Sequence, residues 1–275
     1  VRNKLEGITN EMQATLLFSA FSPIVKEAMD CSAALFTADG QTIAQATAIP
    51  IHLATMIPAL RAVLDTYPAH TMQPGDVYIL NDPYCGGTHL PDITLFVPVF
   101  GDGRLYAFSV ATVHHQDVGG MTPGSIPTNA TEIYQEGLRI PPLKIIEAGE
   151  LDGKVLDIIL TNTRTREMLE NDLMSQISSV KVAADDVLQL FAKYGSATMK
   201  ACFVELMDYS ERRTREALAS IPDGVYRHEE PVLDDGAKGG PYWLRLALTK
   251  AGDSVTLDFT GTDRQLRGPL NCVPS

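Results

Sequence analysis

The sequence has 275 residues, of which 45% are hydrophobic and 20% are charged. Such a chain is long enough to bury a large core, as one big domain or as two smaller ones. Its 34 acidic and 22 basic residues give a formal net charge of -12. This charge argues against a nucleic-acid partner, because phosphate contacts need a basic face. No apolar run reaches the length of a membrane span, so the sequence predicts no membrane partner.

The four cysteines are scattered along the chain and form no C-x-x-C pair. Such sparse use indicates reduced thiols and a cytoplasmic protein. The chain also lacks the G-x-x-x-x-G-K-[ST] loop that cradles phosphates, and it has no G-x-G-x-x-G. The sequence therefore predicts no nucleotide pocket within this chain.

The first third of the chain combines helical and hairpin signals. Apolar residues recur at helical spacing over the first twenty residues and predict a helix that ends before Pro23. Two short runs then surround Asp39-Gly40, which predicts a β-hairpin because this dipeptide accepts the positive φ of a tight turn. Residues 56–67 are predicted to form a helix that starts near Pro58.

The middle of the chain favours strands, which we predict at residues 76–80, 93–100 and 104–115. Helical patterns follow from about residue 155 to 194 and from 197 to 220. They predict a long helical hairpin packed on the sheet. Strand patterns then return in "YWLRLALT" and "SVTLDFTG".

These elements predict an α+β protein with a mixed β-sheet core in its first half, a long helical hairpin, and further strands after it. We expect residues 1–150 to form the sheet region with the candidate site, and residues 151–221 to form the hairpin. Residues 222–275 would begin a strand-rich region. The last residues, "GPLNCVPS", are loop-like and close no element, so we expect this to be the N-terminal part of a longer chain.

The strongest local pattern is "NDPYCGGTHLPD", residues 81–92. On a regular strand His89 and Asp92 would face opposite sides, so the glycines and the Leu90-Pro91 pair predict a loop that turns both side chains inward. A second polar group closes the apolar run "FSVATV" at His114 and His115. Because adjacent strand residues point to opposite faces, one site can easily use only one of these two histidines.

Two imidazoles with one or two carboxylates suit a divalent transition metal such as Mn, Fe or Zn. A set of two histidines and one carboxylate leaves coordination positions open for water or substrate. The alternative is that His89 and His114 are hydrogen-bonded histidines in turns. His52, between apolar residues in "IPIHLATM", is more typical of a packed histidine, or of one that supports a ligand, than of a ligand itself.

Several longer motifs, in order along the chain, resemble the hydantoinase B/5-oxoprolinase family, which is related to the acetone carboxylase alpha subunit. They are "SAFSPIVKEAMDCSAALFTADGQTIAQ", "IPIHLATM", "NDPYCGGTHLPDITLFVPVF", "HHQDVGGMTPGS" and "EIYQEGLRIPP". The resemblance runs from about residue 3 to the terminal "GTDRQLRGPLNC". Members of this family are usually considerably longer.

The resemblance implies one divalent metal ion, Mn, Zn or Fe, held by His89, Asp92 and His114. The family's aspartate before the motif S-x-A-L-F corresponds to Asp30, which joins the implied ligand set. The resemblance also implies a hetero-oligomer with an A-type, actin-like ATPase subunit of the hydantoinase A kind. That partner subunit would be the one that uses ATP.

The leading hypothesis is a metal-containing B-type subunit of an ATP-dependent cyclic amidohydrolase, of the 5-oxoprolinase or N-methylhydantoinase type. It would open a lactam or imide ring of a small-molecule substrate, with His115, Asp117 or Glu136 as the group that transfers a proton. Two alternatives stay open. One is a subunit of an ATP-dependent acetone-type carboxylase, and the other is a non-catalytic assembly subunit with a structural metal.

Overall fold

The computed structural model describes residues 1–273 and contains helices and strands in both halves of the chain, as the sequence predicts for an α+β protein. The chain forms two compact units. The first unit comprises residues 1–126, 136–203 and 273, and the second comprises residues 127–135 and 204–272. Among the described residues, no helix combines the length and the apolar character that crossing a bilayer needs.

A seven-stranded sheet with the order β2-β1-β5-β4-β3-β6-β7 forms the centre of the first unit. Its strands are β1 Cys31–Thr37, β2 Thr42–Gln45, β3 Val77–Leu80, β4 Asp92–Gly101, β5 Arg104–His114, β6 Leu143–Glu147 and β7 Glu150–Leu151. Every described pairing is antiparallel, whereas the sequence suggested a mixed sheet. The reason is that β1–β2 and β4–β5 are hairpins, and among the described residues no α-helix joins two consecutive strands that are neighbours in the sheet, as a parallel pair would require.

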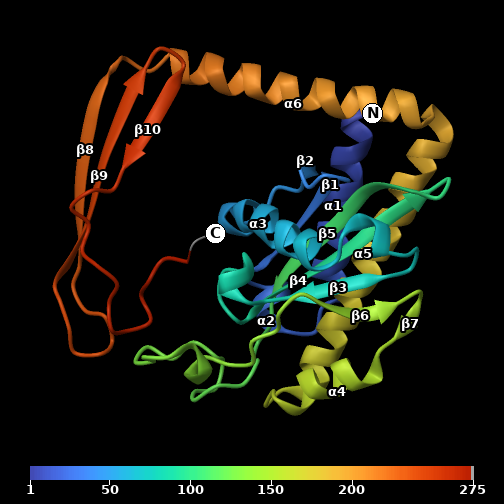
Figure 1. Ribbon diagram of the computed structural model, residues 1–275. Helices are drawn as coiled ribbons and strands as arrows, with labels where there is room; N and C mark the ends of the chain where they lie inside the picture. Colours follow the sequence, from blue (N-terminus) through green and yellow to red (C-terminus); the bar gives the residue numbers. More distant parts are fainter. Residues whose placement is uncertain (274–275) are drawn as a thin grey trace. The chain divides into compact units, whose positions relative to one another are not determined.

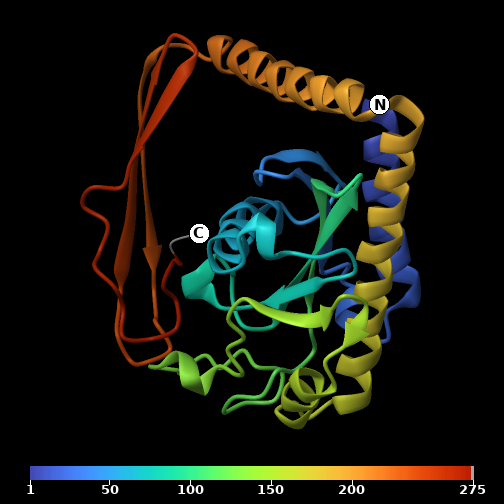
Figure 2. The same cartoon turned by 45° about the vertical axis from the view of Figure 1, so that its right-hand side comes forward.

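Helices cover both faces of this sheet (Figures 1 and 2). α1, Arg2–Ser19, and α5, Arg166–Tyr194, pack together on one face, and α3, Pro50–Thr66, packs on the other. Side chains on both faces of β1, β4 and β5 are therefore buried. The result is a layered unit whose central strands are shielded from solvent on both sides.

The helix on the second face begins earlier than the sequence predicted. α3 starts at Pro50, in the first turn where proline costs nothing, and Pro58 lies inside it. Burial of Met56, Leu60 and Val63 against the sheet offsets the backbone hydrogen bond that Pro58 removes. The early start has a consequence for the site, because it places His52 in the first turn of the helix.

The pattern predicted as one helix from about residue 155 is interrupted. α4, Gly153–Thr161, and α5 are separated by residues 162–165. The break contains Arg164, whose backbone and side chain both bond to Asp117. Local periodicity does not report such a contact, because its partner lies 47 positions earlier in the chain.

The second unit contains a three-stranded antiparallel sheet in the order β10-β9-β8. Its strands are β8 Gly224–Val232, β9 Tyr242–Ala251 and β10 Ser254–Asp258. The two later strands were predicted, but β8 was not, since its sequence "GVYRHEEPV" carries three charged groups and a histidine.

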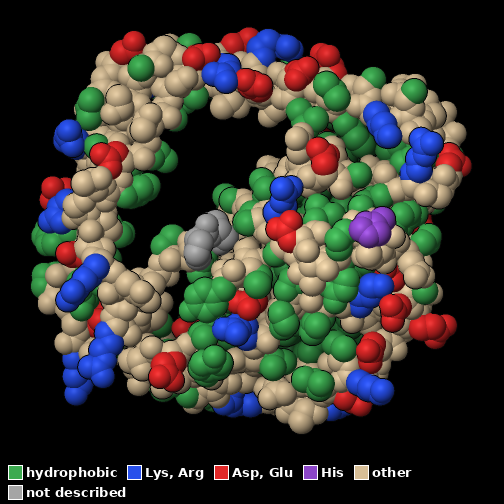
Figure 3. Space-filling view, viewed as in Figure 1, with side chains coloured by type: hydrophobic (Ala, Val, Ile, Leu, Met, Phe, Trp, Pro, Cys, Tyr) green, Lys and Arg blue, Asp and Glu red, His purple; other side chains and the backbone are tan. Residues whose placement is uncertain are grey.

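α6, Ser196–Ala219, begins in the first unit and continues into the second. Acidic and basic side chains are interspersed along it (Figure 3).

The short α2, Pro23–Lys26, follows α1, and three turns of 3-10 helix complete the described elements. These turns are Ala69–Thr71, Pro83–Cys85 and Ile133–Gln135. The turn at Pro83–Cys85 lies inside the "NDPYCGGTHLPD" segment and is capped by the Asp82 carboxylate, which accepts from the Tyr84 backbone N–H.

Candidate metal centre

The order of the strands brings the predicted metal ligands to one edge of the sheet. Asp92 is the first residue of β4 and pairs directly with His114, the last residue of β5. Asp30 immediately precedes β1, which is the other neighbour of β5, and its carbonyl accepts the His114 backbone N–H. Three side chains from distant parts of the sequence therefore meet because β1, β5 and β4 end side by side.

The character of the sheet face toward α3 changes along β4 and β5 as these strands approach the site. Apolar pairs come first, then a pair of threonines whose hydroxyls lie 2.8 Å apart, then the candidate ligands. The residues in this order are Phe96 and Val110, Thr94 and Thr112, and Asp92 and His114. The ligands thus lie at the end of a well-packed core, which holds their backbone firmly.

Three side chains converge on a common point. His89 Nε2 lies 3.0 Å from Asp92 Oδ1, and His114 Nδ1 lies 3.2 Å from the same oxygen. One ligand atom from each of these three residues can be chosen so that all lie within 4.8 Å of one another. Asp30 joins them from the side, with its Oδ2 3.5 Å from His114 Nδ1.

This donor set fits a divalent ion. Asp92 Oδ1 is buried, and among the described residues no N–H or O–H approaches it in hydrogen-bonding geometry, although two imidazole nitrogens are close. A buried carboxylate oxygen without a donor calls for an explanation, such as an ion. Two imidazole nitrogens and one or two carboxylates are the ligands that Mn, Fe and Zn accept.

His52 is a further histidine at this site. Its Nε2 lies 3.3 Å from Asp92 Oδ2 and 3.6 Å from Asp30 Oδ1, so it stands between the two carboxylates. Its Nδ1 lies 3.2 Å from the Ser32 hydroxyl. The Thr88 hydroxyl also donates a hydrogen bond to Asp92 Oδ2. His52 and Thr88 therefore orient the oxygen of Asp92 that does not face His89 and His114.

The charges of the cluster are strongly coupled. Burial by itself would raise the pKa of the Asp92 carboxyl, but the imidazoles of His114, His52 and His89 outweigh it and hold this pKa well below its usual range. Burial would lower the pKa of His89, but the neighbouring Asp92 carboxylate raises it overall. Asp92 is consequently ionised at neutral pH, as a metal ligand must be.

The glycines of "NDPYCGGTHLPD" allow the loop to approach other backbone segments closely. Gly86 has a φ of 93°, and a Cβ there would collide with the backbone of Ala59 in α3. The buried Asn81 amide then ties the loop together, donating to the carbonyls of Leu90 and Leu138 at 2.6 and 2.9 Å. The loop that carries His89 is therefore tightly constrained.

Of the three residues predicted to transfer a proton, His115 points away from the cluster. It is fully buried, and its Nε2 lies 3.3 Å from Gln176 Oε1 on α5, behind the sheet. Burial lowers the pKa of His115 to about 4, so the imidazole is neutral at neutral pH. The sequence predicted that side chains alternate along this strand, and this alternation explains why His114 and His115 point to opposite faces of the sheet.

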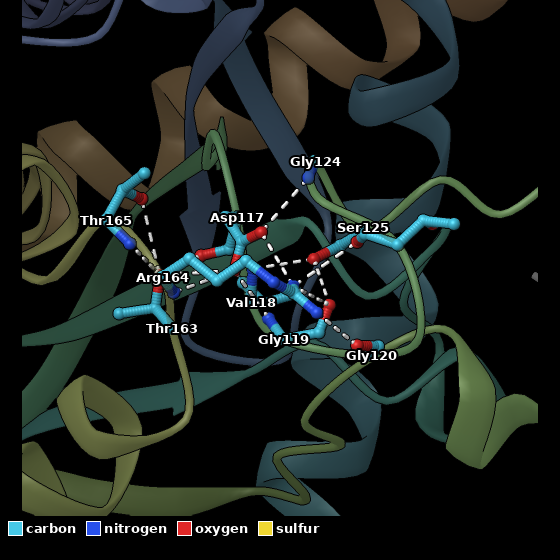
Figure 4. Close-up of polar contacts among 10 residues, drawn as sticks. Asp117, Val118, Gly119, Gly120, Gly124, Ser125, Thr163, Arg164 and Thr165 are labelled. Atoms are coloured by element: carbon cyan, nitrogen blue, oxygen red, sulfur yellow. Dashed lines mark hydrogen bonds and ion pairs between the residues drawn. The ribbon is translucent and has the colours of Figure 1, made fainter.

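Asp117 is surrounded by hydrogen-bond donors (Figure 4). Its carboxylate accepts from the backbone N–H groups of Gly119, Gly124 and Arg164 at 2.9 to 3.0 Å, and from Arg164 Nη1 at 3.0 Å. Burial would raise the pKa of Asp117, but these donors outweigh it and lower it. The Arg164 guanidinium also donates to the Gly120 carbonyl, so the pair organises the loop after β5.

Glu136 is the predicted proton-transfer residue with the most suitable electrostatic environment. Burial raises the pKa of its carboxyl, and the nearby charge of His89 offsets part of this shift. Among the described residues, no hydrogen bond to the Glu136 carboxylate is formed. Two residues after Glu136, the backbone N–H of Leu138 donates to the Val118 carbonyl at 2.8 Å, which ties this segment to the loop after β5.

The sequence profile of the hydantoinase B/oxoprolinase family matches residues 1–275. The chain belongs to this family. It is 37% identical over 255 residues to the caprolactamase subunit beta of Pseudomonas jessenii, covering 93% of this chain and 44% of that relative. The crystal structure of the ATP-dependent caprolactamase from the same organism matches with a TM-score of 0.87 at 35% identity, over 93% of this chain and 44% of that one.

A nucleotide-free structure of acetone carboxylase shares the fold, with a TM-score of 0.85 at 22% identity over 95% of this chain and 36% of that one. The resemblance inferred from the motifs is thus confirmed at the level of the family and of the fold. This family member spans less than half of the length of the relatives described above.

Proposed function

We propose that this hydantoinase B/oxoprolinase family member is the metal-containing part of a B-type subunit in an ATP-dependent cyclic amidohydrolase. The substrate would be a lactam or an imide, as for 5-oxoprolinase or N-methylhydantoinase. The name of the relative that is 37% identical, a caprolactamase subunit beta, supports both the substrate class and the assignment to one subunit of an assembly. In the proposed assembly, an A-type subunit of the actin-like ATPase kind uses ATP to activate the ring carbonyl.

The observation that carries the proposal is the convergence of His89, Asp92 and His114 on one point, with a buried Asp92 oxygen that lacks a donor. These three residues and Asp30 would hold the ion. When bound, a divalent ion such as Mn²⁺, Zn²⁺ or Fe²⁺ polarises a carbonyl oxygen and makes water a better nucleophile at neutral pH. Two histidines with one or two carboxylates leave positions open for such chemistry.

The remaining residues of the site have roles that their contacts support. His52 and Thr88 hold the Asp92 carboxylate in one orientation. Glu136 takes the proton from the attacking water and returns it to the ring nitrogen that leaves. A carboxyl whose pKa is raised by burial suits this task, because it accepts a proton more readily than an exposed carboxylate does. His115 and Asp117 support the structure of the strand end and the following loop.

Reconstitution of the whole assembly tests the proposal. The full polypeptide that contains residues 1–275 is purified with its ATPase partner, and metal content is measured by atomic emission for wild type, His89→Ala and His114→Ala. The exposed His70, which lies in the turn Ala69–Thr71, gives the matched control His70→Ala. We expect stoichiometric metal in wild type and in the control, and a loss of metal in the two site variants. Undiminished metal in both site variants would contradict the assignment.

The same preparation distinguishes cyclic amide hydrolysis from carboxylation and from a purely structural role. ATP-dependent turnover of a lactam or imide without bicarbonate supports the amidohydrolase. Turnover of a ketone that requires bicarbonate would establish the carboxylase instead. Stoichiometric metal without either activity would establish a structural ion in an assembly subunit.

A further inference from the structure

Gln176 is a buried glutamine on α5 whose side chain reaches between the two strands that end in the candidate ligands. Its Nε2 donates to the carbonyl of Ile93 on β4 at 2.9 Å and to the carbonyl of Ala111 on β5 at 2.8 Å. Its Oε1 lies 3.3 Å from His115 Nε2. Among the described residues, the three polar contacts of this side chain are to β4, to β5 and to the residue that follows β5, and none of its surface is exposed.

Two of these three contacts lie next to the candidate ligands in sequence. Ile93 directly follows Asp92, and His115 directly follows His114. Because successive strand residues point to opposite faces, fixing His115 toward α5 also fixes His114 toward α3, where His52 lies. Gln176 thus holds, from behind the sheet, the two backbone segments whose front carries Asp92 and His114.

The hydrogen bonds also decide the orientation of both side chains. The Gln176 atom that faces two carbonyl oxygens has to be the NH₂ group, because only a donor is satisfied there. The oxygen therefore faces His115, whose Nε2 must carry the proton that it donates. The Gln176 amide and the His115 imidazole therefore each have one orientation and one assignment of donors and acceptors.

We infer that Gln176 is a positioning residue for the candidate metal centre, which sets the separation of Asp92 and His114 by joining the ends of β4 and β5. This inference rests on the proposed metal binding by these residues. Removing the amide takes one hydrogen bond from each of two buried carbonyls, which keep their partners in the β4–β5 ladder, and leaves one buried imidazole N–H without its partner. The strand ends then relax, and the ligands no longer match the geometry of the ion. Partners that orient metal ligands typically contribute about 10–100-fold to metal affinity.

The test compares Gln176→Met with Ser179→Ala in the full polypeptide. Methionine keeps the length and the packing of glutamine and removes the three polar contacts. Ser179 is also buried on α5, but its hydroxyl donates to the Met12 carbonyl of α1 at 3.1 Å and not to β4 or β5. The dissociation constant for Zn²⁺ is measured by competition with a chelator, and the free energy of unfolding is measured on the metal-free proteins.

We expect Gln176→Met to weaken Zn²⁺ binding by about 10–100-fold, and Ser179→Ala to leave the affinity unchanged. The visible absorption of bound Co²⁺ should change in Gln176→Met only, because this spectrum reports coordination geometry and not stability. If the methionine variant does not fold, Gln176→Glu replaces it, since it keeps the acceptor for His115 and loses the donor to the two carbonyls.

Failure of this inference can be separated from failure of the proposed function. If wild type binds no Zn²⁺ or Co²⁺, the metal proposal is wrong. If wild type binds the ion and the Gln176 variants bind it with the same affinity and the same Co²⁺ spectrum, only the positioning role is overturned. A loss of affinity in Ser179→Ala that equals the loss in Gln176→Met would also overturn it, since general destabilisation would then be the cause.

Discussion

Two buried aspartates near the same strand ends show how differently one residue type is used. Asp92 and Asp117 are 3% and 2% exposed, and each lies three residues after a histidine, His89 and His114 respectively. Asp92 Oδ1 has no donor in hydrogen-bonding geometry among the described residues and lies close to two imidazoles. The Asp117 carboxylate is occupied by three backbone N–H groups and the Arg164 guanidinium.

The comparison shows that the donors around a carboxylate determine its function. The imidazoles of His89 and His114 can bind an ion together with Asp92, so two of the three imidazoles that lower the pKa of Asp92 belong to the candidate ligand set. The donors around Asp117 are backbone N–H groups and the guanidinium of Arg164, which hold the loop after β5 to the break before α5 and cannot themselves bind a metal ion. Asp92 is therefore suited to binding, and Asp117 is suited to holding the loop after β5.

The largest expected effect is the loss of metal in Asp92→Asn. Asparagine keeps the shape of the side chain and removes the charge that a divalent ion needs. We expect metal affinity to fall by more than the roughly 100-fold that an orienting partner contributes, with turnover of the assembly lost as well. Metal analysis and circular dichroism of the folded variant measure this. Retention of stoichiometric metal would show that Asp92 is not a ligand.

Glu136→Gln should be next in size. We expect turnover to fall by about 10²–10⁴-fold with the metal retained, as for loss of a general base. A base works only when deprotonated, and burial raises the pKa of Glu136 above its ordinary value of 4.5. Activity of wild type should therefore decline as pH falls through this raised pKa. A pH–rate profile whose acid limb is unchanged in Glu136→Gln would contradict the assignment.

His52→Phe tests whether the contacts around Asp92 matter beyond the ligands. Phenylalanine keeps a ring in the first turn of α3 and removes the nitrogen that lies between the Asp92 and Asp30 carboxylates. We expect metal affinity to decrease by about 10–100-fold without a complete loss. Chelator competition gives the value. Wild-type affinity in this variant would mean that Thr88 and the fold alone orient Asp92.

Asp117→Asn tests the second aspartate of the comparison, which holds the loop after β5. The new NH₂ group would face donors at either position, namely two backbone N–H groups at Oδ1 or the Gly124 N–H and Arg164 Nη1 at Oδ2, so at least two hydrogen bonds are lost. We expect the free energy of unfolding to fall by about 1–3 kcal/mol, with metal content retained and turnover reduced less than in Glu136→Gln. The exposed pair of Arg166 with Asp157 gives the control Asp157→Asn, which should change stability little. A turnover loss as large as that of Glu136→Gln would restore Asp117 as a candidate base.

The smallest effect concerns acid stability. The pKa of Asp117 is lower in the folded protein than its ordinary value of 3.8. Its contribution to stability is therefore present above pH 3.8 and is lost as pH falls through the lower folded value. We expect Asp117→Asn to flatten the dependence of unfolding free energy on pH in this acid range only. Denaturant titrations from neutral to acid pH measure this. A parallel displacement of the whole curve would mean that Asp117 does not titrate during unfolding.

The sequence by itself determined the features that short segments encode. Asp39-Gly40 specified the hairpin of β1 and β2, since a tight turn depends on the φ values of two residues. The glycines and proline around His89 specified a loop, and the end of an apolar run specified the position of His114. The motifs of the family were also local and in order, which made the family recognisable.

Only the tertiary structure decided which of these groups meet. The strand order β1-β5-β4 places Asp30 beside His114, and the start of α3 at Pro50 brings His52 between two carboxylates. No local pattern distinguished Asp117 from Asp92 or separated Gln176 from the other polar residues of a long helix. The physical reason is that the role of a polar side chain depends on which donors and acceptors fill its lone pairs and N–H groups. These partners come from segments far apart in the chain, so periodicity and turn chemistry do not report them.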